Sequence, residues 1–217
     1  MKGLFLKDWY GLLGMYKKNL ALVLVLYAAL SMVLNMPFFL FMTPWLLGFY
    51  TLSSFSLDES CRWNLYARTL PVSTRQIVGG KFLLALSWIV PGTIYAGIVG
   101  GIVCMLHPGE TSGAEMAISS AVVGVVAIDM ISILLAMTFR SGVEKARSSF
   151  FLIFVGFFLL LFLGGQIGML DDAGLIAALA SIAAYPLLWA LGGLAVAVLI
   201  PVICFFLSCR IYANKEF

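Results

Sequence analysis

Residues 19–57 have the sequence NLALVLVLYAALSMVLNMPFFLFMTPWLLGFYTLSSFSL, which contains no charged side chain. A transmembrane helix needs about 20 apolar residues, so this stretch is long enough for two crossings. Pro37 divides it, because proline cannot continue a helix and disfavours helical backbone at the residue before it. The chain is basic on both flanks of the stretch. We therefore predict two spans, over 19–36 and 38–57, that start and end on the same side of a membrane.

The same alternation of apolar stretches and basic clusters continues along the rest of the chain. Since cytoplasmic loops of membrane proteins are enriched in Lys and Arg, we place every basic cluster in the cytoplasm. The outer segments then carry only acids, at Glu110, Glu115, Asp171 and Asp172. Four further spans are expected, over 82–106, 116–139, 148–170 and 187–209. The 13 basic residues are Lys2, Lys7, Lys17, Lys18, Arg62, Arg68, Arg75, Lys81, Arg140, Lys145, Arg147, Arg210 and Lys215.

The segment that precedes the last span is too long to belong to a single crossing. Two full crossings at this point would leave Arg210 and Lys215 outside the cell, against the charge rule. We therefore expect residues 171–186 to form a short re-entrant outer helix that ends at Pro186. With this arrangement both termini are cytoplasmic.

Composition supports an all-α polytopic membrane protein with six transmembrane helices. Apolar residues make up 63% of the chain and charged residues 11%, and the mean hydropathy is +1.08. Soluble domains carry about a quarter charged residues. Little chain is left for loops, so we expect one transmembrane domain over 1–217, and any soluble chemistry must come from a partner. The basic residues are dispersed around helix ends, which argues against a nucleic-acid partner.

The N-terminal segment 1–18 is predicted to be an amphipathic helix lying in the cytoplasmic membrane interface. On a helix, two opposite stripes form, one of glycines and lysines and one of aromatic and apolar residues. An irregular anchored tail is the alternative. The first stripe contains Gly3, Lys7, Gly11, Gly14 and Lys18, and the second contains Phe5, Trp9, Leu12 and Tyr16.

Enzyme signatures are lacking. His107 is the single histidine, so it has no histidine partner for a metal site or a nucleophile–base pair. Gly79-Gly80-Lys81 is followed by Phe82 and not by Ser or Thr, so the chain contains no phosphate-binding P-loop at this point. We expect no catalytic residue, no metal and no cofactor on this chain.

Asp129 is the one ionisable residue well inside a predicted span. A carboxylate at the bilayer centre costs roughly 3 kcal/mol on insertion scales, so it must face the protein interior or water. It is a candidate for the translocation pathway or for proton transfer. Equally, it could accept hydrogen bonds from a neighbouring helix or stay protonated.

Residues 58–81 form the longest predicted cytoplasmic segment. Trp63, Tyr66 and Leu70 recur at helical spacing, which predicts a short amphipathic helix that Pro71 ends. Ser73 followed three residues later by Gln76 has the form of a capping box and predicts the start of a new helix. Such a helix–break–helix element is suited to transmitting motion between a soluble partner and the spans. The alternative is an interfacial helix with an aromatic belt.

These features resemble the permease subunits of type-2 ABC exporters, in particular the compact bacterial family that includes transporters for bacteriocins and amphipathic peptides. The resemblance rests on Asp58-Glu59, Trp63, Tyr66, Thr69 to Ser73 and Lys81, with the basic start at 1–18 and the tail at 210–217.

The resemblance implies that the cytoplasmic segment contains a coupling helix that docks on a separate ATP-binding subunit, where Mg-ATP is bound and hydrolysed. It further implies a dimer with a second copy or a paralogue of the permease, in a bacterial cytoplasmic membrane, and export of hydrophobic or amphipathic substrate such as peptide. The implied coupling residues are Asp58, Glu59, Arg62, Trp63, Tyr66, Arg68, Leu70, Pro71, Ser73 and Arg75. The alternative function is a stand-alone proton- or ion-coupled carrier that uses Asp129.

Overall fold

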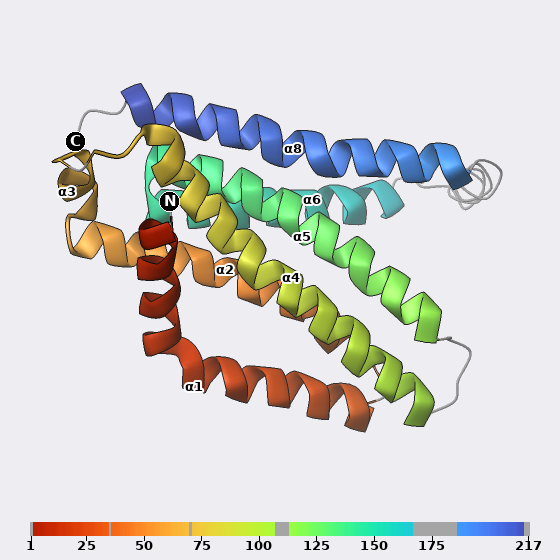
Figure 1. The fold of residues 1–217 in the computed structure, drawn as a ribbon. Coiled ribbons are helices and arrows are strands. Elements are labelled where there is room, and N and C mark those ends of the chain that lie inside the picture. Colours follow the sequence, from red (N-terminus) through yellow and green to blue (C-terminus); the bar gives the residue numbers. More distant parts are fainter. Residues whose placement is uncertain (1, 35, 70, 107–112, 167–185, 215–217) are drawn as a thin grey trace.

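The computed structural model describes residues 2–34, 36–69, 71–106, 113–166 and 186–214. The regular structure in these residues is helical, and no strand occurs among them. The long helices lie side by side as a bundle, with α3 at one end of it (Figure 1). The helices are α1 (Lys2–Leu34), α2 (Phe38–Ser60), α3 (Trp63–Thr69), α4 (Thr74–Leu106), α5 (Gly113–Ser141), α6 (Val143–Gln166) and α8 (Pro186–Asn214).

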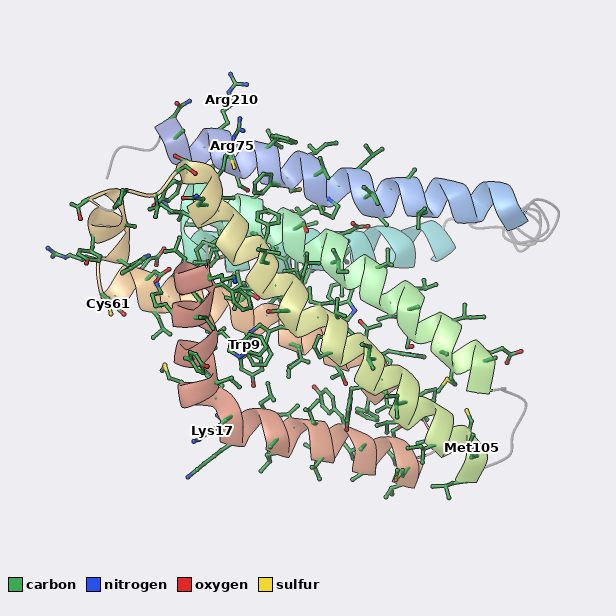
Figure 2. All side chains as sticks on the ribbon, in the orientation of Figure 1. Trp9, Lys17, Cys61, Arg75, Met105 and Arg210 are labelled. Carbon is green, nitrogen blue, oxygen red and sulfur yellow. The ribbon has the colours of Figure 1, made fainter. Side chains whose placement is uncertain are left out.

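Helix α1 joins the predicted interfacial helix and the first predicted span in one continuous element. It bends sharply (Figure 1), and Lys17 lies at the bend (Figure 2). We call the part before the bend, Lys2–Lys17, the first arm of α1. The predicted apolar stripe of this arm packs inward, where Trp9 lies 4.8 Å from Trp88 of α4 between ring centroids. The irregular tail considered as the alternative is therefore wrong.

Proline and a side-chain cap set the two boundaries around α2 and α4. Helix α2 begins directly after Pro37, as expected from its sequence. Helix α4 begins at Thr74, and the backbone N–H of Ser73 donates to Gln76 Oε1 at 3.0 Å. This bond is half of the predicted capping box, and it confirms the start of a helix that continues through the third predicted span.

The predicted inner loop at 140–147 is wrong, because only Gly142 separates α5 from α6. Gly142 has a φ of +82°, a left-handed conformation that glycine adopts without the steric penalty of a Cβ atom. Its N–H donates to the carbonyl of Thr138 at 2.9 Å. The fourth and fifth predicted spans are thus joined by a one-residue turn, and α6 already begins at Val143.

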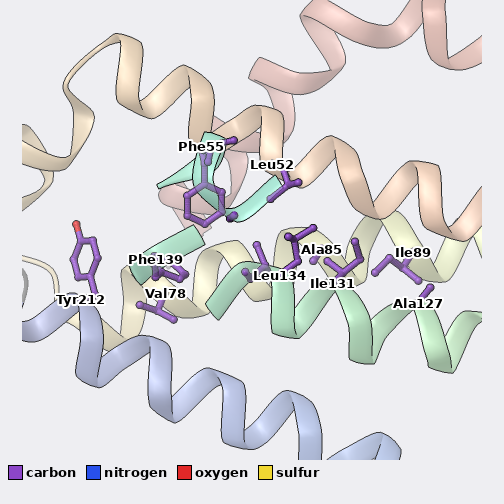
Figure 3. Packing of buried hydrophobic residues seen from close by; sticks show 13 residues of the cluster. Leu52, Phe55, Val78, Ala85, Ile89, Ala127, Ile131, Leu134, Phe139 and Tyr212 are labelled. Carbon is purple, nitrogen blue, oxygen red and sulfur yellow. The ribbon is translucent and has the colours of Figure 1, made fainter. Parts of the chain in front are cut away.

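The core of the bundle lies between α2, α4 and α5 (Figure 3). Helix α4 packs on both α2 and α5, and α5 also packs on α8. Glycines allow this close approach: a Cβ atom on Gly48 would come within 2.7 Å of Ile131, and one on Gly92 within 2.7 Å of Leu47. The main buried apolar side chains are Leu52, Phe55, Val78, Ala85, Ile89, Ala127, Ile131, Leu134, Leu135, Phe139, Val143, Ala146 and Tyr212.

Five helices of the described chain are long and apolar enough to cross a membrane: α1, α2, α4, α5 and the part of α8 from Gly192 onward. Their outward faces carry large apolar side chains, such as Val25 (68% exposed) and Val33 (80% exposed). Side chains of this kind gain by contact with lipid and not with water. The chain is therefore a multi-pass membrane protein. Helix α6 coincides with most of the fifth predicted span, whereas the predicted re-entrant helix at 171–186 lies, except for Pro186 at the start of α8, outside the described residues.

Candidate functional site

The start of α1, the whole of α3, the start of α4 and the end of α8 lie together at one end of the bundle (Figure 1). Arg75 of α4 and Arg210 of α8 are close together there, and Met105 lies at the opposite end (Figure 2). We call this the basic end. The predicted cytoplasmic clusters of α1, α4 and α8 thus meet at one side of the molecule, as the alternation of charges along the sequence predicts.

Helix α3 projects from the basic end because a tight turn follows α2. The N–H of Cys61 donates to Leu57 O at 3.1 Å and that of Arg62 donates to Glu59 O at 3.2 Å. Arg62 itself has a φ of +50°, which is uncommon for a residue with a side chain. Such a conformation persists only where the surroundings hold it. The short helix therefore leaves the end of α2 through a tight, hydrogen-bonded turn.

The outer face of this element is exposed. Tyr66 is 56% exposed, and its ring lies 5.3 Å from that of the half-buried Trp63. We call the exposed members of the predicted coupling set from Arg62 onward the α3 surface. Exposed arginine and aromatic side chains are suited to binding an acidic or polar groove on another protein. The α3 surface consists of Arg62, Tyr66, Pro71, Ser73 and Arg75.

Beneath α3, four charged side chains form a closed ring of alternating sign. Lys7 Nζ contacts Asp8 Oδ1 at 3.1 Å and Asp58 Oδ1 at 2.6 Å. Lys81 Nζ contacts the other two oxygens, Asp8 Oδ2 at 2.9 Å and Asp58 Oδ2 at 2.5 Å. Lys81 also donates to Ser54 Oγ at 2.5 Å. Every carboxylate oxygen is thus paired with a lysine, and α1, α2 and α4 are joined at one point.

This charge ring, Lys7–Asp8–Lys81–Asp58, gives Asp58 a structural role. Only 9% of the Asp58 side chain is exposed, and both its oxygens are engaged by lysines of the same chain. A buried carboxylate needs such partners to offset the cost of its burial. Within this chain Asp58 supports α3 from inside, and its contact with an ATPase stays a prediction.

Glu59, the next residue, links α2 to the turn between α5 and α6. Its Oε1 accepts a hydrogen bond from the N–H of Val143 at 3.4 Å. Val143 is the first residue of α6, where unpaired N–H groups and the helix dipole favour a negative charge. Glu59 is exposed as well, so it holds the hairpin while remaining accessible from outside.

Sequence reasoning missed Lys7 and Asp8 as part of this site, and it used Lys81 only as a point of resemblance. A signal was present, because Asp8 shares a helix face with Phe5 and Leu12. Likewise Lys81 shares a face with Val78 and Ala85, which are buried. A charged residue on an apolar helix face needs a buried partner of opposite charge. The side chain of Arg68 and the whole of Leu70 lie outside the described part of the chain.

Asp129 lies near the middle of α5, whereas the charge ring lies at the basic end. It faces α8 and is close enough to Cys204 to interact with it electrostatically. Its Oδ1 is buried, and none of the described residues offers it a hydrogen bond. A carboxylate in such a place has capacity for a ligand, for water or for a proton. The structure does not bring Asp129 together with the coupling residues.

Comparison with known proteins matches one family. A family model described as "ABC-2 family transporter protein" covers residues 3–213. No curated protein and no solved structure matches the chain. The match spans nearly the whole sequence, including the first arm of α1, the charge ring and α3. The chain belongs to the ABC-2 transporter family, as a membrane permease subunit of an ABC transporter.

Proposed function

We propose that this chain is the permease subunit of an ATP-driven exporter that moves hydrophobic or amphipathic substrate, such as peptide, outward across a bacterial cytoplasmic membrane. A separate ATP-binding subunit, carrying Mg-ATP, supplies the energy. Two permeases, identical or paralogous, form the working unit with two such ATPases. Membership of the ABC-2 family supports the pairing with an ATP-binding subunit.

The observation that carries the proposal is α3, a short helix that projects from the bundle at the basic end. ATP binding closes the ATPase dimer and moves α3, and the spans joined to it rearrange. Tyr66 fills a groove of the ATPase, and Arg62 and Arg75 bind acidic groups beside it. Glu59 passes the movement to the α5–α6 hairpin through its bond to the Val143 N–H.

The basic residues at this end of the molecule also support an orientation in the membrane. With six spans, α6 being the fifth, the basic end faces the cytoplasm and both termini are on that side. The charge clusters support this orientation. Five of the helices already meet the length and hydropathy of a span, and α6 contains 24 residues, enough for a crossing.

An apolar groove between α2 and α6 supports amphipathic cargo. Pockets that bind small molecules have volumes of about 300 to 1,000 Å³, and this groove has a volume of ≈ 490 Å³. Aromatic rings dominate the lining, and one cation, Arg147, stands at its rim. The lining residues are Met42, Trp45, Phe49, Arg147, Phe150 and Phe151. Asp129 is proposed as a second polar side chain of the translocation pathway, besides Arg147.

The test is copurification from native membranes. Wild-type chain is expected to recover a soluble protein with a phosphate-binding P-loop, and Tyr66→Ala is expected to lose most of it. Tyr10→Ala is the matched control, because Tyr10 is 68% exposed and belongs to α1 and not to the α3 surface. Equal recovery with Tyr66→Ala and Tyr10→Ala would contradict the assignment of α3. Recovery of wild-type chain alone would favour the stand-alone carrier.

A further inference from the structure

The charge ring connects α3 with the first arm of α1 through a cation–π contact. Lys7 Nζ lies 3.8 Å from the centroid of the Trp63 ring, at the start of α3. The same ammonium binds Asp8 on its own helix and Asp58 at the end of α2. Lys7 is therefore held by α3 and α2 together, although it belongs to α1.

The ring is a stiff connection and not a set of surface ion pairs. The side chains of Asp8 and Lys81 are only 7% and 6% exposed. Pulling one of them out of the ring leaves a buried charge without its partner, which is far more unfavourable than separating two solvated charges. The buried members thus resist separation of α1, α2 and α4, and Lys7, whose side chain is 35% exposed, extends the connection to α3.

The first arm of α1 is also fixed along its length. Leu12 is fully buried and packs with Leu84 and Trp88 of α4. Beyond the bend, α1 continues into the first span, where Tyr95 of α4 donates to the carbonyl of Leu24 at 2.7 Å. A displacement of the first arm therefore has a continuous path into two spans.

We propose that Lys7, Asp8 and Lys81 are positioning residues for coupling: the charge ring makes the first arm of α1 move with α3, so that force from the ATPase reaches the spans α1 and α4. This rests on the proposed function. It adds to that function a second connection between α3 and the spans, formed by residues that lie outside the α3 surface.

The experiment uses a double variant that removes one positive and one negative charge from the ring. Lys7→Met with Asp8→Asn removes both ring members that α1 contributes, and leaves the Lys81 contacts with Asp58 and Ser54 in place. The matched control is Glu144→Gln with Lys145→Met, an adjacent acid–lysine pair that is exposed on α6. Both double variants keep the net charge and make the same kinds of substitution.

The readout is the amount of a fluorescently labelled amphipathic peptide moved per ATP hydrolysed, in proteoliposomes that contain the permease and its copurified ATPase. The proposal expects the ring variant to retain ATPase binding and hydrolysis while this ratio falls about tenfold or more, and the control to match wild type. An unchanged ratio would overturn it. Loss of ATPase binding would also overturn it, because the ring would then shape the docking surface and not transmit movement. Failure of wild-type chain to bind any ATPase would instead contradict the proposed function.

A second measurement tests the connection in the isolated chain. Spin labels at Tyr10→Cys and Tyr66→Cys, in a background without the four native cysteines, report the distance between the first arm of α1 and α3. A narrow distribution is expected with the ring intact and a broad one in the Lys7→Met, Asp8→Asn variant. Equal widths would refute the stiff connection, whether or not transport has been measured.

Discussion

Lys81→Met should destabilise the folded chain far more than the loss of an exposed lysine. Lys81 Nζ contacts Asp8 Oδ2 at 2.9 Å, Asp58 Oδ2 at 2.5 Å and Ser54 Oγ at 2.5 Å. Its removal leaves two buried carboxylates that share a single cation, Lys7. The two negative charges then repel each other at a place that water barely reaches.

The magnitude follows from the burial of the ring. Breaking a buried ion pair by removing one partner costs about 3–5 kcal/mol. Removing one cation and one anion together is close to neutral, because no uncompensated charge remains. Lys81→Met with Asp8→Asn keeps Lys7 and Asp58 paired at 2.6 Å, so this double variant should recover most of the stability lost by the single one.

The assay is unfolding by denaturant in detergent, followed by tryptophan fluorescence, with the free energy of unfolding fitted for each variant. Lys145→Met is the control, because Lys145 is exposed, and its effect should stay within about 0.5 kcal/mol. If Lys81→Met and the double variant lose equal stability, the ring does not behave as a balanced set of charges and the reasoning is refuted.

Three further predictions concern the helices. Gly142→Ala should lower the free energy of unfolding by about 1–2 kcal/mol, since the φ of +82° strains any residue with a Cβ atom; stability equal to wild type would show that the turn relaxes. Gly92→Ala should cost about 1–3 kcal/mol through overpacking against Leu47 and the backbone of Pro44, whereas Gly101→Ala should not, because nothing lies within 4 Å of its added Cβ; thermal unfolding in detergent compares the two. Asp129→Asn should slow transport about tenfold, the worth of one charged hydrogen bond, without changing ATPase binding, and unchanged transport would remove Asp129 from the pathway.

Local signals in the sequence predicted the elements well. Pro37 and the Ser73–Gln76 pair mark helix starts that the structure contains, because each acts on the backbone within one turn. Hydropathy and charge clusters are local signals too, because each helix in the membrane must pair its own backbone polar groups. They therefore predicted the long apolar helices that the structure contains. The predicted inner loop at 140–147 was wrong because one glycine in a left-handed conformation is sufficient to reverse the chain.

The charge ring was not predicted, because its members lie far apart along the chain and meet only through packing. Asp8 and Asp58 belong to different helices that the bend in α1 brings together. The glycines that matter for packing, Gly48 and Gly92, also follow no fixed spacing, since they sit where two helices cross and not where a motif repeats. Such positions depend on the tertiary arrangement.

We propose that α3 is the contact surface for an ATP-binding subunit. Photo-crosslinking in native membranes tests this, with a photoreactive phenylalanine derivative in place of Tyr66 and, as the matched position, in place of Tyr10. We expect a crosslinked product between the Tyr66 position and a protein that carries a phosphate-binding P-loop, and no such product from the Tyr10 position. Crosslinks from the Tyr66 position to lipid alone, under conditions in which the complex is intact, would contradict it.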